Sequence, residues 1–304
     1  RFFENKIGLD VAYYSRNTTN DILATGISAT SGFGSTIINI GELTNKGVEL
    51  LLNVVAYQRK DFQWDFSLNY ANNQSNVVSL GTNAKGEPID FINLDESRLR
   101  RERIRHIVGQ PLGMIAGFKQ LTIDGQKVYD DRGLPVPTNG LETIAEGRHP
   151  ISAGFVNNFS YKNFRLMVLL DGRFGGHLVS GTNYFAYNNG LHEETLASRE
   201  NGLTVSGVDA NGEARTWNIP ANSSDPTQFL IDDYFNRYAQ ITENIVYDAS
   251  FIKLREFSFG YSLPGTLLSK TPFTAASVSL VGRNLALIWS KVPNIDPESA
   301  YTVG

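Results

Sequence analysis

Apolar and polar residues alternate along several stretches of this chain, and the alternation is most regular at residues 62–70. Every second residue there is apolar and those between are polar, in the order Phe-Gln-Trp-Asp-Phe-Ser-Leu-Asn-Tyr. This period of two predicts a β-strand with one apolar and one polar face. The stretch exceeds the ~5 to 6 residues of an average strand and matches the about 9 to 11 that cross a bilayer. We therefore expect these side chains to face lipid: Phe62, Trp64, Phe66, Leu68 and Tyr70.

The same alternation recurs along the chain, at residues 7–14, 47–54, 151–161, 164–171 and 256–263, and more weakly around 278–280. In the segment 256–263 the residues expected to face lipid are Phe257, Phe259 and Tyr261. Tyrosines gather at the ends of these segments, as they do at the two interfaces of a membrane. The pattern predicts an all-β fold, a transmembrane antiparallel β-barrel.

The connections between these segments are of two kinds. Residues 58–61, 162–163 and 264–272 are short links rich in turn formers, whereas 17–42, 72–149 and 175–245 are long. Outer-membrane barrels have this asymmetry of short turns and long external loops. The strands on either side of 72–149 run in opposite directions, so we expect zero or two crossings between them. We also expect residues 109–120 to form a loop hairpin with 127–129.

Composition and charge exclude several classes of protein. The chain has 41% hydrophobic and 19% charged residues and a net charge of -4, which excludes disorder and gives no sign of a nucleic-acid partner. It lacks an uninterrupted apolar run of about 18 residues, the length of a transmembrane helix. It has no cysteine, which excludes disulfides, thiolate nucleophiles and zinc sites built on cysteine.

The histidines and acidic residues of this sequence do not have the spacing of a catalytic or metal-binding motif. None of the four histidines is part of an HExxH motif, and the acidic pairs lack the spacing of a calcium loop. We expect turns at Asp124-Gly125 and at Asp130-Asp131, and a helix start at Asp232-Asp233. We therefore predict neither catalytic nor metal-binding residues; the histidines are His106, His149, His177 and His192.

Aromatic residues in the longest connection are the candidates for contact with a substrate or a partner. Such side chains form platforms for sugars or peptides, although packing against neighbouring loops is an equal alternative. The four candidates are Tyr184, Phe185, Tyr187 and Trp217.

Two sets of basic residues also attract attention. A run of arginines occupies another long connection, where it forms a solvated face or binds acidic ligands: Arg98, Arg100, Arg101, Arg103 and Arg105. Lys253 and Arg255 share the parity of Phe257 and Phe259. We expect both side chains at the outer edge of the apolar band, where long basic chains reach water.

Five short motifs, in order along nearly the whole chain, give it a family resemblance. They are Asn45–Leu50, Val246–Glu256, Phe259–Pro264, Gly282–Leu285 and Asn294–Glu298. In them the chain resembles the C-terminal barrel of SusC/RagA-type TonB-dependent transporters. The resemblance implies a plugged barrel of about 22 strands. It also implies that residues 1–304 form the C-terminal segment of that barrel, with the plug domain and the final closing strand not present in this chain.

The resemblance carries expectations about function as well. It implies import of glycans or peptides across the outer membrane of Bacteroidota-type bacteria, with a SusD-like surface lipoprotein and the TonB complex as partners. Energy comes through TonB, so the resemblance implies no cofactor and no enzymatic activity. Two alternatives stay open at this point: a passive porin-like channel, and a soluble β-sandwich that binds or degrades carbohydrate.

Overall fold

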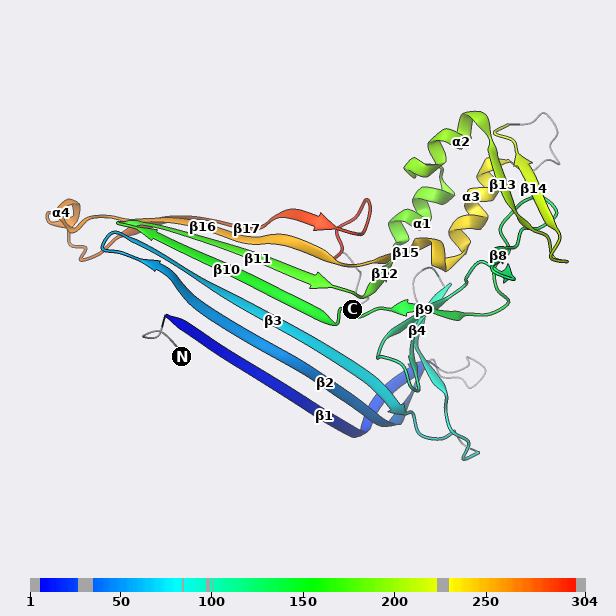
Figure 1. The fold of residues 1–304 in the computed structure, drawn as a ribbon, viewed down its shortest axis with the longest axis horizontal. Coiled ribbons are helices and arrows are strands. Elements are labelled where there is room, and N and C mark those ends of the chain that lie inside the picture. Colours follow the sequence, from blue (N-terminus) through cyan, green and yellow to red (C-terminus); the bar gives the residue numbers. More distant parts are fainter. Residues whose placement is uncertain are drawn as a thin grey trace.

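A seven-stranded antiparallel sheet forms the larger part of the molecule (Figure 1). The computed structural model describes residues 6–26, 35–83, 85–96, 99, 101–222 and 230–298. The strands follow one another across the sheet in chain order, and each predicted segment contributes one. They are β1 (Ile7–Gly26), β2 (Ser35–Gln58), β3 (Phe62–Ser79), β10 (Ile151–Tyr161), β11 (Phe164–Phe174), β16 (Phe251–Ser262) and β17 (Ser277–Ser290).

The connections alternate between short and long, as predicted. At one end of the sheet, β2 turns into β3, β10 into β11 through Lys162 with a φ of 53°, and β16 into β17 through α4 (Gly265–Leu268). β3 pairs directly with β10, so the prediction of zero or two crossings is confirmed with zero. Within the described residues the sheet does not close, because β1 and β17 each pair with a single neighbour.

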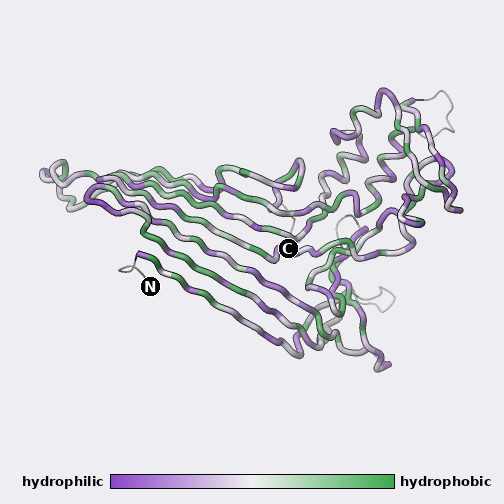
Figure 2. The backbone as a smooth tube through the Cα atoms, in the orientation of Figure 1, coloured by the Kyte–Doolittle hydropathy of each residue, from purple (hydrophilic) through white to green (hydrophobic). Residues whose placement is uncertain are grey.

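Hydrophobic and hydrophilic residues alternate along the strands (Figure 2). Because this alternation is kept in register between neighbouring strands, the two faces of the sheet differ in polarity. Phe66 and Leu68 pair with Asn157 and Phe155 of β10, and Val168 of β11 pairs with Phe257. These registers place all eight residues predicted to face lipid on one side, called the apolar face here. Aromatic pairs span the strands of this face, such as Trp64–Phe159, Phe66–Phe155, Phe164–Phe259 and Phe164–Tyr261, with ring centroids 4.7–5.9 Å apart.

The first strands are longer than their alternation suggests. β1 has 20 residues and β2 has 24, and they remain paired from Ile7 opposite Val54 to Gly26 opposite Ser35. The prediction that residues 17–42 form a long loop is therefore wrong over most of its length. Both strands continue far past the last residue of the alternating pattern.

The other connections fold into a layer beyond the far end of the sheet, called the loop layer here (Figure 1). Its first part is a four-stranded sheet of β4 (Phe91–Glu96), β5 (Glu102–Ile107), β6 (Met114–Gly117) and β9 (Glu142–Glu146). The predicted pairing of 109–120 with 127–129 is wrong for β6, which pairs with β5 and β9. A small hairpin follows at β7 (Thr122–Ile123) and β8 (Gln126–Lys127), with the predicted turn at Asp124-Gly125.

The second part of the loop layer is helical. A helix start at Asp232 is confirmed, because α3 (Ile231–Gln240) begins there and the Asp233 carboxylate accepts the Leu230 N–H at 3.0 Å. No helix in the described ranges is long and apolar enough to span a membrane. The other elements are β12 (His177–Val179), α1 (Gly181–Asn188), η2 (Glu193–Thr195), α2 (Leu196–Asn201), β13 (Leu203–Val208), β14 (Ala214–Ile219), η3 (Thr242–Ile245) and β15 (Val246–Asp248).

Two buried clusters join the loop layer to the sheet. Val77 and Leu80, at the end of β3, pack with Ile92 of β4. On the other side, Leu178 of β12 and Ala249 pack with Val292, which follows β17. The loop layer is therefore attached to the sheet at both its early and its late strands.

Candidate functional site

A hydrophobic core holds the helical part of the loop layer together. It brings α1 and α3 against the β13–β14 hairpin and residues near 129–134. Its buried members are Tyr129, Leu134, Tyr187, Val205, Ile219, Ile231, Tyr234, Phe235, Ala239 and Ile245. The layer thus has its own core, and its surface side chains rest on an ordered scaffold.

Three of the four predicted contact residues take part in this core. Tyr187 is 2% exposed, its hydroxyl donates to a Glu194 carboxylate oxygen at 2.7 Å, and its ring stacks on His192 at 4.0 Å between centroids. Burial and the bond to Glu194 raise the pKa of Tyr187. Trp217 packs on Tyr129 with ring centroids 5.5 Å apart, and Tyr184 lies half-buried against the core. The structure thus gives these three a packing role.

Phe185 is the exception among the four. It lies on α1 with 56% of its surface exposed, and its ring meets Tyr184 edge-on at 5.2 Å. A large exposed aromatic side chain on an ordered helix is suited to stacking against a sugar ring or a peptide side chain. Contact with a substrate or a partner therefore remains a prediction for Phe185, whose exposed side chain can make it without a change in α1.

Replacing Tyr187 by Phe tests the packing role. The Tyr187→Phe variant loses the hydroxyl but keeps the ring on His192, and it leaves Glu194 without its 2.7 Å partner. We expect a loss of about 0.5 to 1.5 kcal/mol of local stability, because the bond is only partly buried and the exposed Glu194 carboxylate can bind water instead. Hydrogen exchange of α1 measures this loss, and unchanged exchange would show that the bond contributes nothing.

Lys253 and Arg255 lie where the sequence pattern did not place them. A β-bulge at Arg255 interrupts β16, so that Leu169 and Leu170 of β11 pair with Glu256 and Leu254. The bulge reverses the parity of the residues before it, because one residue has no partner across the ladder. Lys253 consequently lies on the polar face, opposite Asp171, and the prediction of an apolar-face position is wrong.

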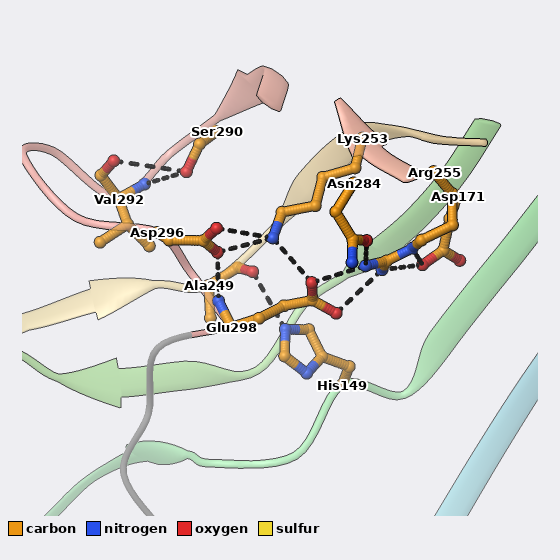
Figure 3. A network of polar contacts seen from close by, with 10 residues as sticks. All are labelled: His149, Asp171, Ala249, Lys253, Arg255, Asn284, Ser290, Val292, Asp296 and Glu298. Carbon is orange, nitrogen blue, oxygen red and sulfur yellow. Dashed lines mark hydrogen bonds and ion pairs between the residues drawn. The ribbon is translucent and has the colours of Figure 1, made fainter. Parts of the chain in front are cut away.

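A network of ion pairs surrounds these two cations on the polar face (Figure 3). The Lys253 ammonium contacts Asp296 at 2.7 Å and Glu298 at 2.7 Å. The Arg255 guanidinium donates to Asp171 through Nε at 3.2 Å and to both carboxylate oxygens of Glu298 at 2.9 Å. The bonds from Arg255, followed by those from Lys253, hold the pKa of Glu298 at about 2, so this carboxylate stays ionised at neutral pH.

Sequence reasoning missed the acidic partners of this network. In the sequence, Asp171 is a polar residue of an alternating strand, and Asp296 and Glu298 belong to the motif Asn294–Glu298. Neither position indicates a basic partner. Only the bulge at Arg255 brings the two cations to the same face as these acids. A bulge has no distinctive sequence here, so the pairing was not visible without the fold.

The histidines and arginines singled out in the sequence have structural contacts. Arg105 donates to Asn93 Oδ1 at 2.7 Å and lies over the Phe91 ring, while Arg98 and Arg100 lie outside the described residues. In the part of the chain that the structure describes, no group of three His, Cys, Asp or Glu is placed to hold a metal ion. One ring nitrogen of each histidine meets a backbone group at 3.0–3.3 Å: His106 with Gly113, His149 with Ala249, His177 with Glu146 and His192 with Glu194.

Known sequences similar to this chain are TonB-dependent receptors. Residues 1–113 match the family model described as TonB dependent receptor-like, beta-barrel. TonB-dependent receptor P3 of Formosa agariphila is 26% identical over 98% of this chain and 29% of that protein. TonB-dependent receptor SusC of Bacteroides thetaiotaomicron is 24% identical over 98% of this chain and 28% of that protein. The chain thus spans less than a third of the length of these curated relatives.

Solved structures with a similar fold cover the sheet and the loop layer together. The RagAB peptide transporter matches 97% of this chain and 31% of its own, with a TM-score of 0.66 and 21% identity. The RagAB peptide importer in its closed-closed state matches with a TM-score of 0.67 and 21% identity. At this identity the likeness concerns the fold. The seven-stranded sheet, the family model over residues 1–113 and the relatives agree that the chain is similar to a portion of the β-barrel of TonB-dependent receptors such as SusC, with the fold seen in RagAB.

Proposed function

We propose that the protein carrying this chain imports glycans or peptides across the bacterial outer membrane, driven through TonB and assisted by a SusD-like surface lipoprotein. The observation that carries the proposal is the joint match of the sheet and the loop layer, over 98% of the chain, to TonB-dependent receptors. The name of one similar structure, a peptide transporter, supports import as the activity.

The two faces of the sheet support a position in a membrane. The apolar face extends over all seven strands, from Leu9 and Leu52 to Phe259 and Leu280. Several of its side chains are strongly exposed in this chain, among them Val11 at 57% and Leu280 at 70%. A continuous exposed apolar surface of this kind is stable only against an apolar medium. Lipid on this face and an aqueous lumen on the other satisfy both faces.

The first test is to tag the protein that carries this chain in its native host, extract it from the outer membrane with mild detergent, and identify the copurifying molecules by mass spectrometry. We expect a stoichiometric SusD-like lipoprotein, with or without bound oligosaccharide or peptide. A barrel that purifies alone would point to a passive pore or to a receptor that works without this partner. Recovery only in the soluble fraction would overturn the proposal.

Phe185 offers a test at the level of one residue. We expect Phe185→Ala to lower the amount of copurifying ligand or lipoprotein roughly tenfold, as for an exposed aromatic residue central to a contact. Phe273→Ala is the matched control, because Phe273 is 64% exposed and lies at the opposite end of the sheet, near α4. Equal effects of the two substitutions would refute a specific role for Phe185.

A further inference from the structure

The segment that follows β17 runs from the edge of the sheet to the loop layer, and residues 291–298 are called the strap here. Its first half packs as a core element. Val292 is buried against Leu178 and Ala249, and Ile295 packs on the same cluster. The Lys291 N–H donates to the Ser250 carbonyl at 3.1 Å. The strap is therefore seated on the junction of β12, β15 and β16.

The far end of the strap is fastened to the polar face by charges (Figure 3). The Lys253 side chain is 8% exposed, and its ammonium is held between the carboxylates of Asp296 and Glu298. Glu298 also bridges to Arg255, which in turn contacts Asp171 of β11. Three carboxylates and two cations thus join the strap to two strands of the sheet.

The middle of the strap reaches the helices of the loop layer. Asn294 has a φ of 66°, in the left-handed region that asparagine tolerates better than most residues. Its Nδ2 lies 3.4 Å from Asn183 Oδ1 and 3.4 Å from His192 Nε2. Asn183 is fully buried on α1, the helix that also carries Phe185. The strap therefore contacts the sheet at one end and the α1 region near its middle.

We propose that the strap is a brace that fixes the orientation of α1 relative to the sheet, with Lys253 and Arg255 as its positioning residues. The buried Lys253 holds the strap because removing its carboxylate partners leaves a charge in a site that water hardly reaches. Without these carboxylates, hydration of the Lys253 ammonium favours a state in which the strap is displaced from it. Release of the strap removes the Asn294 contact to α1, so the position of α1 and of its exposed Phe185 relative to the sheet is less restrained.

The proposal is tested by hydrogen exchange on the whole protein that carries this chain, purified in mild detergent. In the double variant Asp296→Asn with Glu298→Gln, we expect amides of the strap and of α1 to lose roughly tenfold or more of their protection, while β10 and β11 keep theirs. Adding Lys253→Met to this pair removes the stranded cation. We expect the triple variant to regain part of the protection.

A matched control is available on β16 and its neighbour β17. Arg283 contacts Glu256 at 3.1 Å, but its side chain is 75% exposed, so Arg283→Met removes an ion pair without stranding a buried charge. We expect wild-type exchange in this variant. Unchanged α1 exchange in the double variant would overturn the brace, as would equal losses in α1 and β10. A further loss on adding Lys253→Met would also overturn it, because the cation would then not be what releases the strap.

Discussion

A receptor with Arg in place of Phe66 is expected to lose about 2 to 4 kcal/mol of folding free energy in a bilayer, the range measured for basic residues on the lipid face near the midplane. Phe66 lies in the middle of the alternating part of β3, and its ring packs on Phe155 of the neighbouring strand at 5.5 Å. The substitution removes this contact and places a guanidinium on the apolar face, where the uncharged Asn157 is its cross-strand neighbour on β10. Urea unfolding of the receptor in lipid vesicles measures the loss.

Ser67→Arg is the matched control, one residue along the same strand. Ser67 lies on the polar face, where its hydroxyl donates to Asn53 Oδ1 at 2.6 Å. A guanidinium on this face reaches water in the proposed lumen, so we expect a loss below about 1 kcal/mol, the scale of one neutral hydrogen bond. If both variants lose the same free energy, the apolar face does not contact lipid.

The second large effect is expected at Gly47 of β2, where an added side chain has no room. A Cβ atom added there would stand 2.4 Å from the Tyr14 ring and 2.7 Å from the Asn72 carbonyl oxygen. The ring can rotate away, but the carbonyl belongs to the paired strand and cannot move without breaking the ladder. We expect Gly47→Ala to cost about 1 to 3 kcal/mol or more, the range for overpacked sites. The fraction of folded receptor in the membrane fraction reports this cost.

Gly8→Ala provides the control for Gly47→Ala. Gly8 lies in β1, in the same sheet, but an added Cβ meets only the Asn53 Cβ at an ordinary 3.8 Å. We expect folding at the wild-type level in this variant, since the new methyl group has room. Wild-type folding of Gly47→Ala as well would mean that β1, β2 and β3 separate more easily than their close approach suggests.

The alternating pattern predicted the sheet well, because it records the two environments of each strand. The alternate apolar residues from Phe62 to Tyr70 and from Phe257 to Tyr261 lie on one face, as expected. The turn at Lys162 joins β10 to β11, also as expected. The same reasoning failed at the ends of β1 and β2. Beyond Tyr14 both faces of a paired strand can meet water, so pairing continues without alternation, for example at Asn17 opposite Thr44.

The candidate site was harder to predict than the sheet. The alternation could not show the bulge at Arg255, because one extra residue changes the face of Lys253 without changing the composition of the strand. Nor could composition separate Tyr187 from Phe185, which are two residues apart on one short helix. Burial of one and exposure of the other depend on α3, whose Phe235 stacks over Tyr187 from a position far along the chain.

The length of β2 sets a geometric condition for any lipid-anchored partner. At about 3.3 Å per residue, 24 residues extend roughly 80 Å, and a strand tilted by about 45° rises roughly 55 Å. The hydrocarbon layer is only about 30 Å thick. With the apolar face in a bilayer, the hairpin of β1 and β2 extends beyond the membrane, and its end lies up to about 25 Å from the acyl chains. If the folded domain of a lipoprotein contacts the end of this hairpin, the chain between its lipid anchor and that domain must have at least about seven extended residues.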